Sequence, residues 1–164
     1  MDEFVLIKIG KTVSTHGIKG ELKVISDFEY IDKAYQIERK IMLNNGLHKI
    51  TSIRYHKNYI LITIDDLNNI NDVLKYVGYN VYMVKDDLNL RDDEYLYSDL
   101  INALVIENDE KLGQVLEVVK GGPNDYIKVN SDKDFLIPLI PIYIDRFDKD
   151  KKIIYTKNAK DLIL

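Results

Sequence analysis

Short apolar segments, separated every few residues by turn-forming residues, recur along the whole of this chain. Their length, alternation and enrichment in β-branched and aromatic residues are typical of β-strands. One segment, 69–78, instead places apolar residues at helical spacing, with Asn69 as a candidate N-cap and Gly78 at its end. Residues 157–164 can form a second short helix. The predicted strands cover residues 4–9, 22–25, 41–43, 47–55, 59–64, 79–84, 103–107, 112–119, 126–129, 135–139 and 152–156.

Turn residues join these strands into hairpins and divide them into two sets. Asn45-Gly46 can supply the positive φ angles of one tight turn, and Lys57-Asn58 supplies the next. The polar, acidic segment 86–93 lacks periodicity and is the predicted linker. β units of this size usually close into barrels, because closure removes exposed strand edges. We therefore predict a mainly β chain with two tandem β-barrels, residues 1–85 and 94–164, and one or two short helices.

Composition limits the compartment and the cofactors that we expect. The chain contains no cysteine, which excludes disulfides, thiol catalysis and cysteine-ligated zinc. It has no apolar run of about 18 residues, and its acidic start, residues 1–5, does not match a signal peptide. The three histidines lack the close spacing of metal ligands. We therefore expect a cytoplasmic protein that has no membrane contact, no metal and no cofactor.

Charge is distributed unevenly along the sequence. Residues 1–85 contain 12 basic and 10 acidic side chains, a net charge of +2, and all three histidines. Residues 86–164 contain 11 basic and 17 acidic side chains, a net charge of −6. A mildly basic half joined to an acidic half predicts two surfaces for different kinds of partner. Ordinary variation in surface charge is the alternative explanation.

Motifs for catalysis are incomplete. Gly10-Lys11-Thr12 resembles the end of a phosphate-binding P-loop, but Val5 stands where that motif requires its first glycine. Ser14 and His16 form a serine–histidine pair with no local sign of an exposed, strained turn that would activate the serine. Asp65-Asp66 is better explained as a turn, since neighbouring strand residues point to opposite faces. We predict no catalytic residues and hence a protein that is not an enzyme.

The glycine-containing loop 15–24 is the first candidate site. Gly17 and Gly20 have the spacing that KH domains use to clamp a nucleic-acid backbone, but that motif joins two helices, whereas strand-like sequence flanks this loop. The loop can be a structural turn that closes one end of the barrel. Alternatively, His16, Lys19 and Lys23 contact RNA phosphates, with the two glycines allowing close approach.

The junction 93–100 is the second candidate site. If this segment is extended, Tyr95 and Tyr97 lie on one face and Leu96 lies on the other. Tyrosines displayed together are favoured at protein interfaces, because they combine a large contact area with a hydroxyl group. The alternative is that both tyrosines cover the core of the second barrel.

An ordered set of motifs resembles the RimM family of bacterial ribosome maturation factors. The segment 10–24, GKTVSTHGIKGELKV, is similar to the N-terminal signature of that family. The later matching segments follow in family order and extend the resemblance over nearly the whole chain. They are residues 93–100, 111–115, 122–126, 136–138 and 161–164.

The resemblance implies a fold, a function and a set of partners. It implies a six-stranded barrel related to translation-factor barrels, followed by a PRC-barrel. It also implies a non-catalytic assembly factor for late maturation of the small ribosomal subunit, acting at the head of that subunit and in ribosomal RNA processing. The implied partners are ribosomal protein nineteen of the small subunit and nearby ribosomal RNA, bound by a monomer. The alternatives are a PRC-barrel interaction module with another partner, or an enzyme built on similar barrels.

The resemblance also implies roles for particular residues. The family usually has two adjacent aromatic residues at the junction, whereas here Leu96 separates Tyr95 from Tyr97. Tyr97 matches the second aromatic position, and the first corresponds to Leu96 or Tyr95. Tyr95, Tyr97 and Asp99 are therefore the predicted ribosomal-protein-binding residues. His16, Gly17, Lys19, Gly20 and Lys23 are the predicted residues next to ribosomal RNA.

Overall fold

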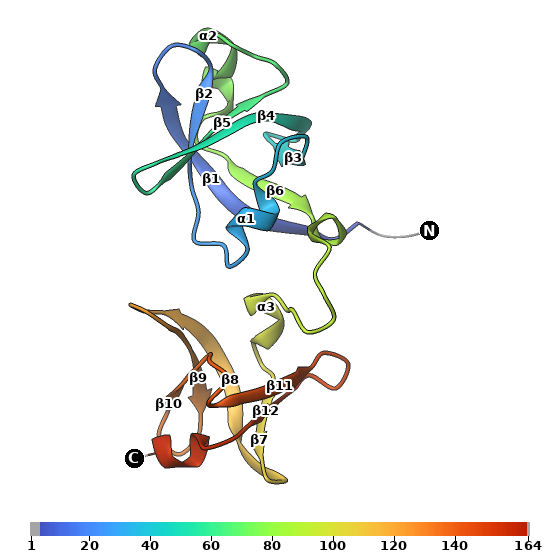
Figure 1. The fold of residues 1–164 in the computed structure, drawn as a ribbon, viewed down its shortest axis with the longest axis vertical. Coiled ribbons are helices and arrows are strands. Elements are labelled where there is room, and N and C mark those ends of the chain that lie inside the picture. Colours follow the sequence, from blue (N-terminus) through green and yellow to red (C-terminus); the bar gives the residue numbers. More distant parts are fainter. Residues whose placement is uncertain (1–3, 164) are drawn as a thin grey trace. The chain divides into compact units, whose positions relative to one another are not determined.

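The chain forms two compact units, residues 1–89 and residues 90–164, in a computed structural model that describes residues 4–163 (Figure 1). Most of the acidic start, Met1–Glu3, and the final residue of the predicted second helix, Leu164, lie outside the described residues. Strands dominate both units and the helices are short, which confirms the mainly β prediction. None of the helices in residues 4–163 has the length and apolarity needed to cross a membrane.

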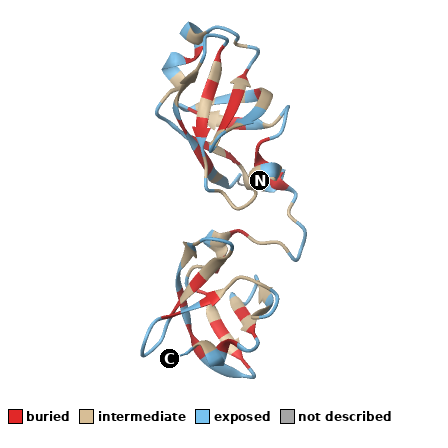
Figure 2. Cartoon of the chain, turned by 60° about the vertical axis from the view of Figure 1, so that its left-hand side comes forward, coloured by how far each residue is buried: buried red, intermediate tan, exposed pale blue. Residues whose placement is uncertain are grey.

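The first unit is a closed antiparallel barrel, as predicted. Its strands follow each other around the barrel in the order β1-β2-β5-β4-β3-β6. Alternate side chains point inward along β2, β3 and β6, so buried residues recur at every second position of these strands (Figure 2). Among the fully buried side chains are Ile9, Leu22, Ile41, Ile62 and Met83. The strands are β1 (Leu6–His16), β2 (Glu21–Ile25), β3 (Lys40–Leu43), β4 (Gly46–His56), β5 (Tyr59–Ile64) and β6 (Asn80–Val84).

Short helical turns complete this unit. The predicted helix at 69–78 is present as α2 (Ile70–Val73), continued by the 3-10 turn η1 (Leu74–Tyr76). The Asn69 side chain accepts a hydrogen bond from the Asn71 backbone N–H at 2.9 Å, which confirms Asn69 as the N-cap. Two further elements were not predicted: α1 (Ile31–Ala34) and the 3-10 turn η2 (Lys85–Leu88), at the start of the predicted linker, whose Leu88 is buried.

One predicted hairpin turn is displaced by a residue. Asn44 and Asn45 have the positive φ angles, +50° and +62°, and Leu43 pairs with Gly46 at the start of β4. The prediction of Asn45-Gly46 as the turning pair is therefore wrong, because asparagine tolerates the left-handed region well enough to fill both central positions. The turn at Lys57-Asn58 is as predicted, with His56 paired to Tyr59.

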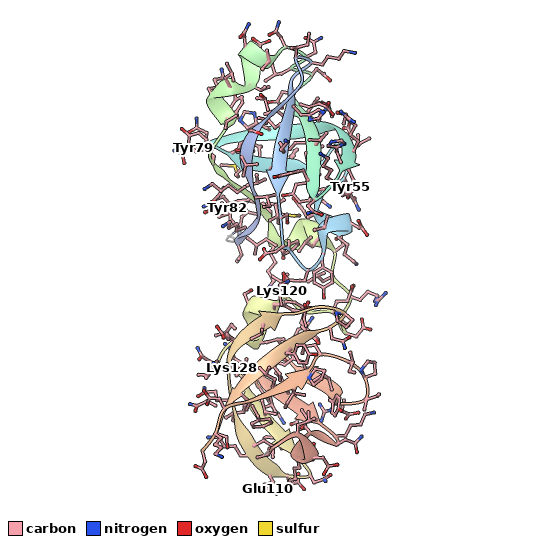
Figure 3. All side chains as sticks on the ribbon, turned by 90° about the vertical axis from the view of Figure 1, so that its left-hand side faces the viewer. Tyr55, Tyr79, Tyr82, Glu110, Lys120 and Lys128 are labelled. Atoms are coloured by element: carbon pink, nitrogen blue, oxygen red, sulfur yellow. The ribbon has the colours of Figure 1, made fainter. Side chains whose placement is uncertain are left out.

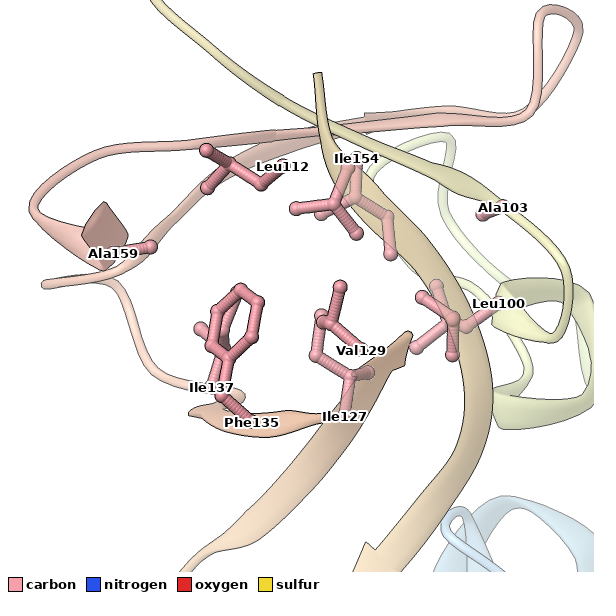
Figure 4. Close-up of a cluster of buried hydrophobic side chains, with 11 residues drawn as sticks. Leu100, Ala103, Leu112, Ile127, Val129, Phe135, Ile137, Ile154 and Ala159 are labelled. Atoms are coloured by element: carbon pink, nitrogen blue, oxygen red, sulfur yellow. The ribbon is translucent and has the colours of Figure 1, made fainter. Parts of the chain in front are cut away.

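The second unit is a barrel-like sheet around one core. Hydrogen bonding gives the order β10-β9-β8-β7-β12-β11 and, in residues 4–163, does not close the sheet between β10 and β11. Five of these strands, β7, β8, β9, β10 and β12, contribute buried side chains to a single cluster. The cluster includes Ile127, Phe135 and Ile154 (Figure 4). β10, which contains Pro138, lies at the edge of the order, where a residue without an N–H is tolerated. The strands are β7 (Leu104–Glu107), β8 (Glu110–Lys120), β9 (Asp125–Asn130), β10 (Phe135–Pro138), β11 (Ile144–Asp148) and β12 (Ile153–Thr156).

The junction differs from the extended segment that the sequence suggested. Residues Tyr97–Leu100 form a helical turn, α3, and Leu96 and Leu100 are buried. The alternation of faces expected for Tyr95 and Tyr97 therefore does not apply. At the other end of the unit, the predicted C-terminal helix is present as the 3-10 turn η3 (Ala159–Leu162).

Candidate functional site

Basic side chains converge on one face of the first barrel. We define the basic cluster as His16 at the end of β1, Lys23 on β2, Arg54 and His56 on β4, and Lys57 in the turn that follows. The strand order places β5 between β2 and β4, and Lys23 and Arg54 both lie opposite Leu61 of β5. The His16 and His56 rings are 5.2 Å apart. Strand pairing thus assembles cations that are far apart in the sequence.

One carboxylate lies within this cluster. Arg54 donates two hydrogen bonds to Glu21, from Nε to Oε2 at 2.7 Å and from Nη2 to Oε1 at 2.9 Å. This bidentate contact lowers the pKa of Glu21, and the positive charges of Arg54, His16 and His56 lower it further. Because a guanidinium has five N–H donors, Arg54 retains donors for an additional anion.

The basic side chains of the cluster lie close enough together to affect one another. Partial burial and the nearby His16, Lys57, Arg54 and Lys23 lower the pKa of His56, because each of these charges disfavours a proton on its ring. Lys23 Nζ lies 4.6 Å from the centre of the Tyr59 ring, so an aromatic face adjoins the cations. The cluster combines the cations Lys23, Arg54 and Lys57 with the carboxylate of Glu21, and this excess of basic side chains is suited to bind phosphate groups.

The predicted loop residues have different environments. His16 and Lys23 belong to the basic cluster, whereas Lys19 is exposed in the turn before β2. Gly17 has φ +64° and open space around it. Gly20 has φ +88°, and a Cβ there would lie 2.5 Å from the Leu67 carbonyl oxygen. Gly20 therefore allows the turn to pack closely against the segment before α2.

The sequence did not identify Arg54, His56 or Lys57 as site residues. Their proximity to Lys23 depends on β5 lying between β2 and β4, which sequence patterns do not give. The sequence does contain a pattern that could have indicated these residues. Arg54 and His56 are two residues apart beside a hairpin turn, and Lys57 lies in that turn. Alternation alone thus predicts two basic side chains on one face of β4.

The junction tyrosines pack against the second unit. The Tyr97 hydroxyl donates a hydrogen bond to Asp125 at 2.7 Å, and Lys120 Nζ lies 4.5 Å from the centre of the Tyr97 ring. The Tyr95 ring meets Phe147 edge-on, with ring centres 5.5 Å apart, and burial raises the pKa of Tyr95. Both rings contact the buried core while remaining partly exposed. They are therefore held in fixed orientations at the surface.

Asp99 stabilises the helical turn next to these tyrosines. The Asp99 carboxylate accepts a hydrogen bond from the Leu96 backbone N–H at 3.3 Å. Leu96 is the N-cap residue of α3 and has no side-chain acceptor of its own, so this contact satisfies a backbone donor at the start of the turn. The Asp99 side chain thereby fixes the backbone that carries Tyr97.

The two units also differ in charge. With the boundary after Asn89, the first unit contains 12 basic and 12 acidic side chains and has no net charge. The second contains 11 basic and 15 acidic side chains, a net charge of −4. The first unit therefore offers a local concentration of cations and the second an overall negative surface.

Comparison with known proteins relates this architecture to a family. The profile of the RimM N-terminal domain matches residues 7–88, and that of the PRC-barrel domain matches residues 92–163. The ribosome maturation factor RimM of Staphylococcus haemolyticus is 36% identical over 155 residues, spanning 90% of this chain and 93% of that protein. The chain belongs to the RimM family. RimM of Staphylococcus aureus is 35% identical over 158 residues, spanning 92% of this chain and 95% of its own.

Solved structures carry the same family name. A crystal structure from Pseudomonas aeruginosa, described as a 16S ribosomal RNA processing protein RimM, aligns with 96% of this chain and 99% of its own, with 21% identity and a TM-score of 0.47. In residues 4–163 of this RimM-family chain, no three histidine, aspartate or glutamate side chains are grouped so that they could hold a metal ion.

Proposed function

We propose that this RimM-family chain promotes late maturation of the small ribosomal subunit by binding it, without catalysing a reaction. The names of its relatives as ribosome maturation factors support this role. The observation that carries the proposal is the basic cluster, which gives the first barrel a surface for ribosomal RNA. Binding at the head of the subunit by a monomer in the cytoplasm is part of the same proposal.

The first barrel contacts ribosomal RNA through the basic cluster. Lys23 and Lys57 supply point charges, and Arg54 supplies planar donors that match a phosphate group. His56 becomes a further cation when a nearby phosphate favours its protonated form. Because such contacts release counterions from RNA, binding weakens as the salt concentration rises.

The second unit contacts a ribosomal protein, which we propose to be protein nineteen of the small subunit. Ribosomal proteins are typically basic, so the net charge of −4 favours their approach. Tyr95, Tyr97 and Asp99 form the proposed contact around α3. Fixed, partly exposed aromatic rings lose little conformational freedom when a partner binds, which makes them suitable anchors.

Co-sedimentation tests this proposal. The purified chain is mixed with free small subunits and, separately, with fully assembled ribosomes, each at low and moderate salt. We expect the chain to pellet with free small subunits and not with assembled ribosomes, because a maturation factor must leave before the subunit functions. Failure of a folded chain to pellet with free small subunits at low salt would overturn the proposal.

A further inference from the structure

A second surface of the first barrel has the features of a base-binding groove. It has a volume of about 350 Å³, and its lining residues include Tyr79, Tyr82, Met42 and three asparagines, Asn44, Asn45 and Asn80. This volume falls within the range of small-molecule sites. The groove involves β3, β6 and the start of β1, and β6 is three strands from β5 in either direction around the barrel. The groove therefore lies away from the basic cluster, on the other side of the barrel.

Strand register places lysines beside the aromatic lining. Tyr82 pairs with Met42 on one side and with Lys8 on the other, and Asn80 pairs with Lys11. Residues paired in this way project from the same face of a sheet. β1, β3 and β6 contain lysines at positions 8, 11 and 40 and no aspartate or glutamate. These strands thus place lysines, and no acidic side chain of their own, around an aromatic groove.

The lining is chemically matched to a nucleobase. Tyrosine rings provide faces on which bases stack, and Tyr79 is 40% exposed. Asn80 Nδ2 donates a hydrogen bond to the Tyr82 hydroxyl at 3.3 Å, which helps to orient that ring. An asparagine amide carries both a donor and an acceptor, as the edges of bases do. The neighbouring lysines can neutralise the phosphates on either side of a bound base.

We propose that this groove binds an unpaired nucleobase of single-stranded RNA. The base stacks on the rings of Tyr79 and Tyr82, an asparagine amide contacts its edge, and Lys8 and Lys11 contact the flanking phosphates. An apolar peptide would use the rings and Met42 but would leave the lysines without complementary charge. The inference rests on the proposed function in taking RNA as the partner, and it adds a site on a different face of the barrel.

A fluorescent reporter can test base stacking directly. The chain contains no tryptophan, so Tyr82→Trp introduces a single indole into the groove. Tyr155→Trp is the matched control, since Tyr155 is partly exposed on β12 of the second unit, outside both proposed RNA surfaces. Tyr79 and Tyr82 lie on one side of the first barrel (Figure 3). Each variant is titrated with oligoadenylate, oligouridylate and inorganic polyphosphate. Circular dichroism checks that each variant is folded, and Tyr79→Trp replaces Tyr82→Trp if that variant is not.

We expect both oligonucleotides to quench the groove reporter and polyphosphate to leave it unchanged, because only the oligonucleotides contain stacking bases. Adding Tyr79→Ala to Tyr82→Trp should weaken oligonucleotide binding at least about fivefold. Where Tyr79→Trp is the reporter, Tyr82→Ala takes the place of Tyr79→Ala. Equal quenching of the two sites, or no quenching at concentrations where anisotropy shows bound oligonucleotide, would overturn the inference. Loss of small-subunit binding with intact quenching would overturn only the proposed function.

Discussion

The two glycines of the turn between β1 and β2 both adopt positive φ angles, but their surroundings differ. Gly17 is open to solvent, whereas Gly20 lies against the backbone of residues 67–69. The Ile70 N–H donates to the Ile18 carbonyl at 3.0 Å, so the turn is joined to the start of α2. Gly20 is therefore required both for its backbone angle and for the close approach of two segments.

Alanine substitutions should separate these two requirements. Gly17→Ala should reduce the free energy of unfolding by about 1–2 kcal/mol, the cost of the left-handed angle. Gly20→Ala should reduce it by about 2–4 kcal/mol, because the added Cβ also displaces the Leu67 carbonyl. Urea denaturation of the full chain measures both, with Gly122→Ala as a control at a glycine without close neighbours. Equal losses for Gly17→Ala and Gly20→Ala would contradict this assignment.

The Tyr97 hydroxyl should contribute to stability as well as to surface shape. Tyr97→Phe keeps the ring on the core and removes the hydrogen bond to Asp125, so we expect a loss of about 1 kcal/mol in the free energy of unfolding. Tyr97→Ala would also remove core packing, which would confuse a binding defect with a folding defect. A double-mutant cycle with Asp125→Ala measures the interaction. A coupling energy near zero would show that the hydroxyl and the carboxylate do not interact in solution.

Two carboxylates join separate segments of the first barrel through hydrogen bonds. Glu21 on β2 binds Arg54 on β4 across the intervening β5. His48 on β4 binds Asp65, after β5, with Nδ1 and Oδ2 2.5 Å apart. Burial alone would raise the pKa of Asp65, but hydrogen bonds from the Lys49 backbone and from His48 outweigh it and lower that pKa. Both carboxylates thus have lower pKa values in the folded chain than in the unfolded chain.

These shifts predict acid sensitivity of the first barrel. In the unfolded chain the pKa is 4.5 for Glu21 and 3.8 for Asp65, and folding lowers both. Each lowered pKa adds stability that is present above the pKa of the unfolded chain and is lost as pH falls through the lower pKa of the folded chain. The stability difference between the natural chain and Glu21→Gln should therefore shrink below about pH 4.5. Urea denaturation over a pH series measures this difference, with the exposed Glu117→Gln as control. A difference that stays constant down to pH 3 would contradict the prediction.

RNA binding by the basic cluster should strengthen as pH falls. The pKa of His56 lies below its ordinary value of 6.5 in the free chain, and a bound phosphate favours the protonated ring. Binding then takes up protons, so affinity for RNA should rise as pH falls from about 7.5 to 6. His56→Gln should flatten this dependence, whereas His48→Gln, which removes a histidine paired with Asp65, should not. Anisotropy titrations at several pH values test this, and identical slopes for the two variants would exclude His56.

The alternation of apolar and polar residues predicted most strands, because one side of each strand faces a core. It did not predict every element. β11 was missed because a register shift between Ile144 and Arg146 breaks its alternation. α1 and α3 were missed because each is a single turn stabilised by tertiary packing, such as the burial of Ala34 and Leu100. Local sequence patterns carry too little information for such short helices.

The candidate site was predicted only in part for a related reason. His16 and Lys23 lie within one distinctive motif, so the sequence alone selected them. Arg54, His56 and Lys57 join them only through the strand order of the closed barrel. The junction residues were selected through a family resemblance, while their contacts with Phe147 and Asp125 depend on long-range packing.

At the scale of the whole molecule, the chain divides its proposed tasks between two units. Each unit has its own buried core, so each can hold a binding surface in shape by itself. The first has no net charge but concentrates cations in the basic cluster, which suits RNA. The second is acidic and presents tyrosines held by its core, which suits a basic protein. A ribosomal subunit offers both kinds of partner in one particle.

If the basic cluster binds RNA in the small subunit, the affinity must depend on salt concentration through the charges of the cluster. The most direct measurement is the affinity of the full chain for free small subunits as a function of salt concentration. Lys57→Gln is compared with Lys49→Gln, an equal change of charge at an exposed β4 lysine outside the cluster. We expect Lys57→Gln to weaken binding and to reduce the slope of log affinity against log salt by about 1, and Lys49→Gln to leave both unchanged. Equal slopes for the natural chain and Lys57→Gln would show that Lys57 of the basic cluster makes no contact with RNA phosphates.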